Sequence, residues 1–107
     1  MADGFVYIAG PYSTGDVMIN IRAAVAAADQ LLAAGYVPFV PHLTGMWHLI
    51  SPHEYEEWLD YDLSWLKRCD AVVRLPGESN GADGEVNRAL ALWLPVFESV
   101  DELIANY

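Results

Sequence analysis

The sequence predicts one α/β domain in which helices cover both faces of a mostly parallel sheet. Short apolar runs rich in β-branched residues alternate with longer segments of helical periodicity, which is the pattern of β-α units around a parallel sheet. Glycine and proline residues stand at several of the junctions between these segments. The chain has 107 residues, enough for a single hydrophobic core, so residues 1–107 are expected to form one domain.

The first half of the chain opens on the first predicted strand. Residues 5–9 are mostly β-branched or aromatic and end before Gly10, so they are expected to form a central strand. Asp16 is a suitable N-cap for a helix over residues 17–34, and Gly35 marks its end. The core-facing stripe expected for this helix is Ile21, Val25, Ala28 and Leu32.

The middle of the chain is expected to combine an edge strand, an irregular segment and a helix. Residues 36–40 read as a strand, and Pro38 indicates an edge position because proline cannot donate to a central ladder. Segment 41–51 is expected to be irregular. A helix is predicted over residues 52–68, with Ser51 as its N-cap and proline at its first position. Its expected apolar line is Tyr55, Leu59, Leu63 and Leu66.

The last third repeats the strand and helix pattern twice. Residues 71–75 form an apolar run that reads as a buried strand, and a helix that ends near residue 92 is expected to follow. Residues 95–97 are predicted as the final strand. Ser99 then caps a short helix that carries acidic residues in its first turn, where they suit the helix dipole.

Composition excludes several classes of function. The chain carries 15 acidic and 5 basic residues, a net charge of −10, which argues against a nucleic-acid surface because such surfaces need clustered cations. A small nucleotide held at helix N-termini remains compatible with this charge. The single cysteine, Cys69, excludes an internal disulfide, is expected to be a buried core thiol and fits a reducing compartment. No apolar run approaches the ~20 residues of a membrane span, so a cytoplasmic location is expected.

Glu85 is the first candidate catalytic residue. It follows the glycine-rich turn 79–84, which lies after a predicted strand, at the sheet edge where ligands bind in open parallel sheets. We expect Glu85 near the first turn of its helix, where the helix dipole favours an ionised carboxylate that could act as a nucleophile. The alternative is a capping glutamate, but Ala82, three residues earlier, cannot complete a capping box. Asp83 is the better capping candidate.

Asp62 is the second candidate. Its neighbours one helical turn away are all apolar: Trp58, Leu59, Trp65 and Leu66. A carboxyl group in such surroundings should have a raised pKa or a specific partner, so Asp62 is a candidate general acid. The alternative is a side chain that turns out to solvent. One protonated and one ionised carboxyl group facing each other would suit a retaining glycosidase.

Three short motifs in this order resemble the nucleoside 2-deoxyribosyltransferase-like superfamily. They are residues 7–10 on the first strand, residues 62–66 followed by 69–73, and residues 79–81 with Glu85 and Ala89. This superfamily contains transferases that exchange bases on deoxynucleosides and small hydrolases that cleave deoxynucleoside 5′-monophosphates. The resemblance implies a flavodoxin-like (Rossmann-like) three-layer sandwich with a four- to five-stranded sheet.

The resemblance also implies a role for individual residues. Glu85 would be the nucleophile that forms a glycosyl-enzyme intermediate, Asp62 would serve the nucleobase as acid or base, and Tyr7 would position Glu85. Ser79 and Gly81 would line the sugar or phosphate end of the substrate site, which Gly10 is also expected to line. No cofactor is needed. Whether the sugar passes to water or to another base stays open, with hydrolysis favoured by Ser79 and by the short chain.

The three histidines are possible metal ligands by residue type. His42, His48 and His53 do not share a helical face, and with one cysteine they give no standard zinc pattern, so no metal site is expected. His42 or Trp47, in the segment that leaves the second strand, could instead contact the base.

Partners and rival functions follow from the same features. A homodimer or larger homo-oligomer is expected, because the resemblance implies that a family member of this size needs partner surface to close its site, and the large apolar fraction supports such an assembly. One rival function is a non-catalytic nucleotide-binding or sensing module that uses the same cleft. Another is a binding protein whose acidic surface mimics nucleic acid.

Overall fold

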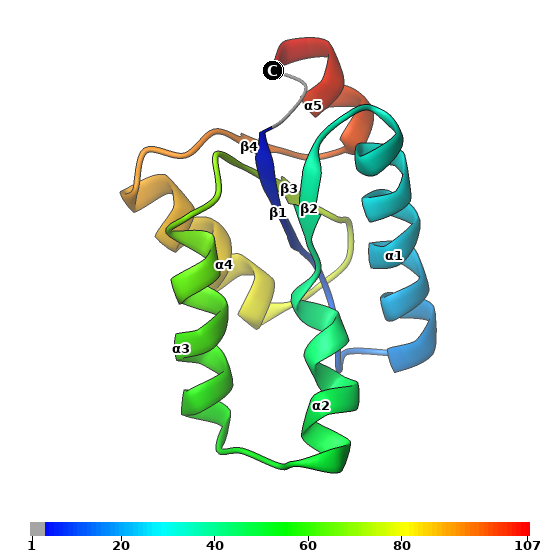
Figure 1. The fold of residues 1–107 in the computed structure, drawn as a ribbon, viewed down its shortest axis with the longest axis vertical. Helices are drawn as coiled ribbons and strands as arrows, with labels where there is room; N and C mark the ends of the chain where they lie inside the picture. The colour runs from blue at the N-terminus through cyan, green and yellow to red at the C-terminus, as the bar shows by residue number, and fades with distance from the viewer. Residues whose placement is uncertain (1–3) are drawn as a thin grey trace.

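Four parallel strands form the central sheet of the computed structural model, which describes residues 4–107 (Figure 1). The strands are β1 (Phe5–Ala9), β2 (Val37–Phe39), β3 (Ala71–Arg74) and β4 (Val96–Phe97). Their order across the sheet is β2-β1-β3-β4, which is the order of flavodoxin-like folds. The predicted α/β fold with a mostly parallel sheet is therefore confirmed, and Pro38 lies on an edge strand as its chemistry required.

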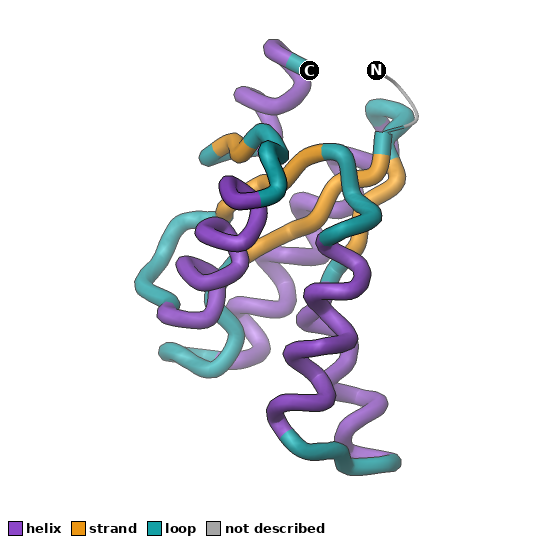
Figure 2. The backbone as a smooth tube through the Cα atoms, turned by 90° about the vertical axis from the view of Figure 1, so that its left-hand side faces the viewer, coloured by secondary structure: helices purple, strands orange, loops and turns teal. Residues whose placement is uncertain are grey.

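Helices cover the sheet on both faces. They are α1 (Val17–Ala33), the 3₁₀ helix η1 (Pro41–Leu43), α2 (Thr44–Ile50), α3 (Tyr55–Leu66), α4 (Asn80–Ala91) and α5 (Val100–Asn106). The pair α1 and α5 packs on one face, while α3 and α4 pack on the other, which gives the three expected layers (Figures 1 and 2). Beyond the carboxyl edge of the sheet, α2 and the start of α3 extend side by side (Figure 1).

The alternation of β1 divides the core between the two helical layers. Val6 and Ile8 face α1 and α5, whereas Tyr7 and Ala9 face α3 and α4, and all four are fully buried. Successive side chains of a strand point to opposite faces, so a central strand with helices on both sides reads as one apolar run. Tyr7 is the polar exception, and its hydroxyl group is consequently placed inside the α3/α4 layer.

The core-facing stripe of α1 differs from the prediction. The buried residues are Ala24, Ala27 and Leu31, one position away from most of the predicted stripe, and the predicted Leu32 is 63% exposed. Apolar residues surround most of this helix, so spacing alone could not select the buried line. The small alanines face the sheet. As predicted, the Asp16 side chain caps the helix, accepting hydrogen bonds from the backbone N–H groups of Met18 and Ile19.

The segment between β2 and α3 was predicted wrongly. Residues 41–51 are largely helical instead of irregular, and α3 begins at Tyr55 instead of residue 52. Glu54 is the N-cap, and the backbone N–H of Glu54 donates a hydrogen bond to the Glu57 side chain at 3.4 Å. The backbone N–H of His53 donates to His48 Nδ1, so residues before Glu54 turn back towards α2 and do not start the helix.

The cap of α4 also differs from the prediction. Ser79 is the N-cap, and its hydroxyl oxygen accepts a hydrogen bond from the backbone N–H of Ala82 at 3.1 Å. Asp83, the predicted cap, lies 3.0 Å from an Arg74 guanidinium nitrogen and pairs with it. Ser99 caps α5 as predicted. Cys69 is buried in the core beneath α3 and α4.

Candidate active site

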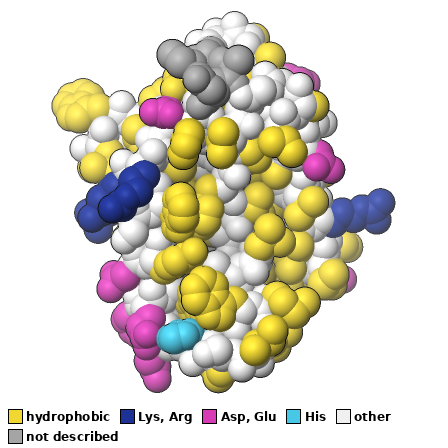
Figure 3. All heavy atoms as spheres, in the orientation of Figure 1, with side chains coloured by type: hydrophobic (Ala, Val, Ile, Leu, Met, Phe, Trp, Pro, Cys, Tyr) yellow, Lys and Arg dark blue, Asp and Glu magenta, His cyan; other side chains and the backbone are white. Residues whose placement is uncertain are grey.

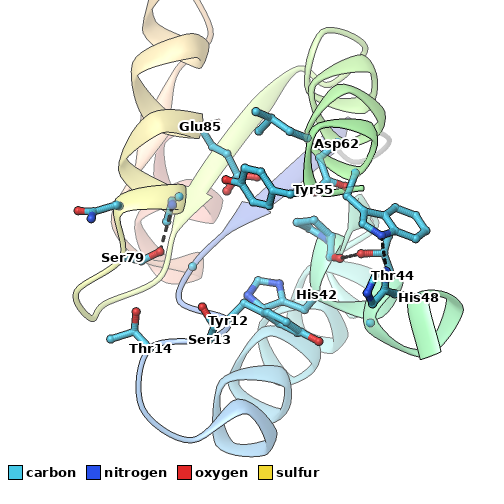
Figure 4. A pocket seen from close by; sticks show the side chains of 18 residues that line it. Tyr12, Ser13, Thr14, His42, Thr44, His48, Tyr55, Asp62, Ser79 and Glu85 are labelled. Carbon is cyan, nitrogen blue, oxygen red and sulfur yellow. Dashed lines mark hydrogen bonds between the residues drawn. The ribbon is translucent and has the colours of Figure 1, made fainter. Parts of the chain in front are cut away.

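A cavity of about 470 Å³ opens at the carboxyl edge of the sheet (Figure 4). Three chain segments build it: the loop after β1, the helical segment after β2, and the N-terminal turns of α4 after β3, with α3 as a fourth wall. This is the edge where parallel α/β folds bind ligands. Its lining residues are Gly10, Tyr12, Ser13, Thr14, Pro41, His42, Thr44, Gly45, His48, Tyr55, Trp58, Leu59, Asp62, Ser79, Asn80, Gly81, Ala82 and Glu85.

Glu85 is held in this cavity by Tyr7. The hydroxyl group of the fully buried Tyr7 donates a hydrogen bond to Glu85 Oε2, joining the middle of β1 to α4. Glu85 is the sixth residue of α4, in its second turn, so the expected place in the first turn was wrong. Burial raises the pKa of Glu85 to about 7, while the Tyr7 hydrogen bond and the charge of Arg74 act in the opposite direction. The helix dipole therefore does not dominate this carboxyl group.

Asp62 faces the same cavity from α3 (Figure 4). Burial, and secondarily the charge of Glu85, raise the pKa of Asp62 to about 7. Its Oδ1 is buried and has no hydrogen-bond partner among residues 4–107. The side chain thus lies in the cavity and does not turn out to solvent, and its pKa shifts in the direction that its apolar neighbours suggest.

The surroundings of the two carboxyl groups determine which one ionises first. Glu85 accepts a hydrogen bond and feels a cation, and both effects favour its ionised form. Asp62 has a partnerless oxygen, and the negative charge of Glu85 opposes its ionisation. Near pH 7 the pair therefore favours an ionised Glu85 beside a protonated Asp62.

The predicted substrate-lining residues at the other wall also meet here. Gly10, Ser79 and Gly81 all line the cavity. The Ser79 hydroxyl oxygen already accepts the capping hydrogen bond of α4, so its side chain fixes the turn as well as facing the cavity. A Cβ atom added at Gly81 would meet only Ser79 Oγ, at 3.9 Å, so a larger residue there would project into free space. Glycine at this position keeps the cavity open to a ligand.

His42 lines the cavity, but Trp47 does not. His42 lies in η1, where its side chain is buried against the loop after β1. Trp47 instead lines a second, shallower groove between β2, α2 and α3, and its ring packs edge-on against Trp58. Trp47 therefore reaches the cavity only through its neighbour Trp58.

Hydrophobic side chains run down the middle of the face shown in Figure 3, with Lys and Arg side chains at its two sides.

In the loop after β1, the sequence predicted only Gly10 as part of the site and missed the residues that follow it. Tyr12, Ser13 and Thr14 line the cavity, and the Asn20 side chain donates to the backbone oxygens of Tyr12 and Thr14 at 2.9 and 2.8 Å. The Tyr12 hydroxyl lies so close to Gly45 that any side chain there would collide with it. Their position in the sequence could have identified them, because they directly follow a central strand and so lie at the carboxyl edge of the sheet, where ligands bind.

Tyr55 was predicted on the apolar line of α3 and Trp58 was noted only as an apolar neighbour of Asp62, yet both line the cavity. Tyr55 is 68% exposed at the start of α3, and Figure 4 shows its phenol ring extending towards Glu85. Trp58 donates its indole N–H to His48 Nδ1 at 2.8 Å, which ties α3 to α2. These aromatic rings provide flat apolar surface in the cavity that the two carboxyl groups also line.

Between Gly4 and Tyr107, no group of three or more His, Cys, Asp or Glu side chains is arranged to hold a metal ion. Within the same residues, no helix has both the length and the apolar character needed to cross a bilayer.

The raised pKa of Asp62 predicts a pH-dependent stability. Because burial raises the pKa of Asp62 from its ordinary value of 3.8 to about 7 in the folded chain, stability is highest at low pH and is lost progressively as the pH rises from about 4 to about 7. Asp62→Asn cannot ionise, so its melting temperature relative to wild type should be higher at pH 8 than at pH 5. Between pH 5 and pH 8 the free energy of unfolding of the variant relative to wild type should rise by about 3 kcal/mol at most, and solvent screening of this partly exposed group makes the rise smaller. Asp60→Asn, at an exposed position of α3, is the control. An Asp62→Asn effect that is equal at both pH values would contradict the buried, protonated carboxyl group.

Comparison with known proteins places this geometry in context. The sequence model of a family described as "Domain of unknown function (DUF7768)" matches residues 4–98. No curated protein matches the chain. Among solved structures, a 2-deoxyribosyltransferase from the psychrotolerant bacterium Bacillus psychrosaccharolyticus superposes with a TM-score of 0.66 and 20% sequence identity. The match covers 86% of this chain and 69% of the transferase. At this identity the likeness shows a shared fold, in agreement with the strand order.

Proposed function

The chain belongs to the DUF7768 family, and we propose that it cleaves the N-glycosidic bond of a nucleoside or nucleoside 5′-monophosphate through a covalent sugar adduct on Glu85. The observation that carries the proposal is the pair of carboxyl groups in one cavity, each with its pKa raised to about 7. Their unequal surroundings favour an ionised Glu85 and a protonated Asp62, the states that a nucleophile and an acid require. The fold shared with a 2-deoxyribosyltransferase supports this chemistry.

In the first half of the reaction, the ionised Glu85 carboxylate attacks C1′ of the sugar. The bond between C1′ and the base nitrogen breaks, and its electron pair leaves with the base. Asp62 gives its proton to the departing base, so no free anion is released. A sugar ester of Glu85 and an ionised Asp62 remain, and the neutral base diffuses away.

In the second half, Asp62 acts as a base. Its carboxylate takes a proton from a water molecule whose oxygen attacks C1′, which releases the sugar and restores ionised Glu85 and protonated Asp62. A second nucleobase that gives its proton to Asp62 could replace the water, and the net reaction would then be base exchange. Whether water or a base accepts the sugar depends on how far the site excludes water.

Tyr7 has a positioning role in this scheme. Burial, and next the charge of Glu85, raise the pKa of Tyr7, so its hydroxyl stays protonated and donates to Glu85 Oε2. The hydrogen bond holds one carboxylate oxygen and leaves the other available for attack. It also lowers the pKa of Glu85, which keeps more of the nucleophile ionised.

Tyr7→Phe should therefore lower kcat/KM and shift its pH dependence. Loss of a hydrogen bond to a charged group predicts about a 10- to 100-fold decrease. The pKa of Glu85 should rise, so the acid limb of the kcat/KM profile should move to higher pH. Tyr36→Phe is the matched control, because the Tyr36 hydroxyl bonds to the Tyr107 backbone oxygen in the opposite helical layer. An unmoved acid limb in Tyr7→Phe would argue against the positioning role.

The rival function is a nucleotide-binding module that uses the same cavity without turnover. A panel of nucleosides and 5′-monophosphates, in deoxy and ribo forms, separates the two functions when free base is measured by chromatography. Base release supports the enzyme, and a new nucleoside in samples with an added free base identifies a transferase. Saturable binding with no base release from any substrate would instead support the binding module.

A further inference from the structure

His42 is a buried polar residue that the scheme above does not use. It lies in η1, directly after β2, and only 5% of its surface is exposed. Its imidazole packs edge-on against Tyr12 and lines the cavity. Figure 4 shows it beside Tyr12 and Ser13, apart from the two carboxyl groups.

The contacts of the His42 ring assign its protons. Nε2 lies 3.0 Å from the backbone oxygen of Pro11, and a carbonyl oxygen can only accept, so Nε2 carries a hydrogen. Burial lowers the pKa of His42, although the backbone oxygens of Pro11 and Gly10 oppose this effect, so the ring is neutral. Nδ1 is then a bare lone pair, an acceptor that cannot donate.

This acceptor has no partner in the chain. Nδ1 is buried without a hydrogen bond to any residue from Gly4 onwards. Buried polar atoms in folded proteins are nearly always paired, so a partnerless acceptor at a cavity wall indicates a ligand that donates to it. The donor must be a neutral or cationic X–H group, which a phosphate dianion does not provide.

The position of the two carboxyl groups indicates which part of a nucleoside reaches His42. C1′ must contact Glu85 and the base must contact Asp62, so the sugar edge away from the glycosidic bond extends towards the loop after β1. That edge carries the 3′- and 5′-hydroxyl groups. Ser13 and Thr14 line this part of the cavity with His42, and none of the described residues that line the cavity is Lys or Arg. Such surroundings suit a hydroxyl group.

We propose that His42 is a specificity-determining residue whose Nδ1 accepts a hydrogen bond from a sugar hydroxyl group, the 3′- or the 5′-hydroxyl, of the bound nucleoside. The proposal rests on the proposed function, because Glu85 and Asp62 define how the nucleoside lies.

Two substitutions separate the two nitrogen atoms of the ring. His42→Gln places an amide N–H near the position of Nε2 and removes the acceptor at Nδ1. His42→Asn keeps an acceptor near Nδ1 and removes the donor to Pro11. Melting temperatures of both variants report on folding. Binding is measured by calorimetry in the Glu85→Gln background, which separates affinity from turnover.

The ligands are the 2′-deoxynucleosides of the four common bases and, for the tightest of them, its 2′,3′-dideoxy and 2′,5′-dideoxy analogues. His42→Gln should weaken binding of the parent nucleoside by about 10-fold, the value of one hydrogen bond, and His42→Asn should weaken it less. For the one analogue that lacks the bonded hydroxyl, His42→Gln should cause no further loss. That analogue identifies the hydroxyl group.

Other outcomes overturn the proposal in distinguishable ways. Equal weakening of the parent and both analogues by His42→Gln would show that Nδ1 reads no sugar hydroxyl. Unchanged affinity in His42→Gln would show the same. If no nucleoside binds either the wild type or Glu85→Gln, the proposed function itself fails, and the role of His42 fails with it.

Discussion

Glu85→Gln is expected to abolish base release, with kcat lower by about 10³-fold or more, because a neutral amide cannot form the ester with C1′. The substitution keeps the size of the side chain, so the variant should still bind its substrate. Initial rates of base release by chromatography, together with calorimetric affinity, measure the two effects separately.

Glu78→Gln is the control for this prediction. Glu78 is exposed on the turn before Ser79, so its substitution removes the same charge from the same region and leaves the cavity unchanged. Its kcat should stay within about twofold of wild type. Base release by Glu85→Gln at a rate close to wild type would exclude Glu85 as the nucleophile.

Asp62→Asn should have the second largest effect, a decrease in kcat/KM of about 10²- to 10⁴-fold, because asparagine cannot protonate the leaving base. The wild-type profile should be bell-shaped and centred near pH 7, since activity needs an ionised Glu85 and a protonated Asp62. The alkaline limb belongs to Asp62 and should disappear in the variant. Rates measured from pH 5 to 9 test both features.

The leaving group gives this prediction a sharper control. A 7-methylpurine nucleoside carries a cationic base that departs without protonation, so Asp62→Asn should impair its cleavage much less. Asp60→Asn, an exposed carboxylate on the same helix, should leave both substrates unaffected. Equal losses by Asp62→Asn on ordinary and methylated nucleosides would mean that Asp62 acts as something other than the acid.

The sheet and the two carboxyl groups were accessible from sequence for physical reasons. β1 and β3 are buried on both faces, so each appears as an unbroken apolar run. Asp62 was conspicuous because its helical neighbours are apolar, and the structure places it in the cavity that Glu85 also lines. An acidic residue among apolar helical neighbours can be recognised from the sequence alone, because those neighbours lie only three or four positions away along the chain.

The features that sequence could not give depend on tertiary contacts. α2 is short and none of its residues is fully buried, so its periodicity carries no sign of a core. The start of α3 depends on His48, which accepts hydrogen bonds from His53 and from Trp58. The stripe of α1 was misplaced because alanines, not the larger Val25 and Leu32, face the sheet.

The ionisation of Glu85 shows the same limit. Its position near a helix N-terminus suggested that the dipole would control it, whereas burial raises its pKa and the Tyr7 hydroxyl opposes that rise. Tyr7 is far from Glu85 in sequence, and only the parallel pairing of β1 with β3 brings the two together. Electrostatic properties of this kind need the assembled site.

Mass spectrometry of a trapped adduct would test the central claim most directly. Fluorine at C2′ destabilises the electron-poor transition states at C1′, so a 2′-fluoro nucleoside that the enzyme accepts should accumulate as the sugar ester. The account predicts one added fluorosugar per chain, mapped to the peptide that contains Glu85 and absent from Glu85→Gln. Release of base with no adduct on the chain, or an adduct on another residue, would contradict it.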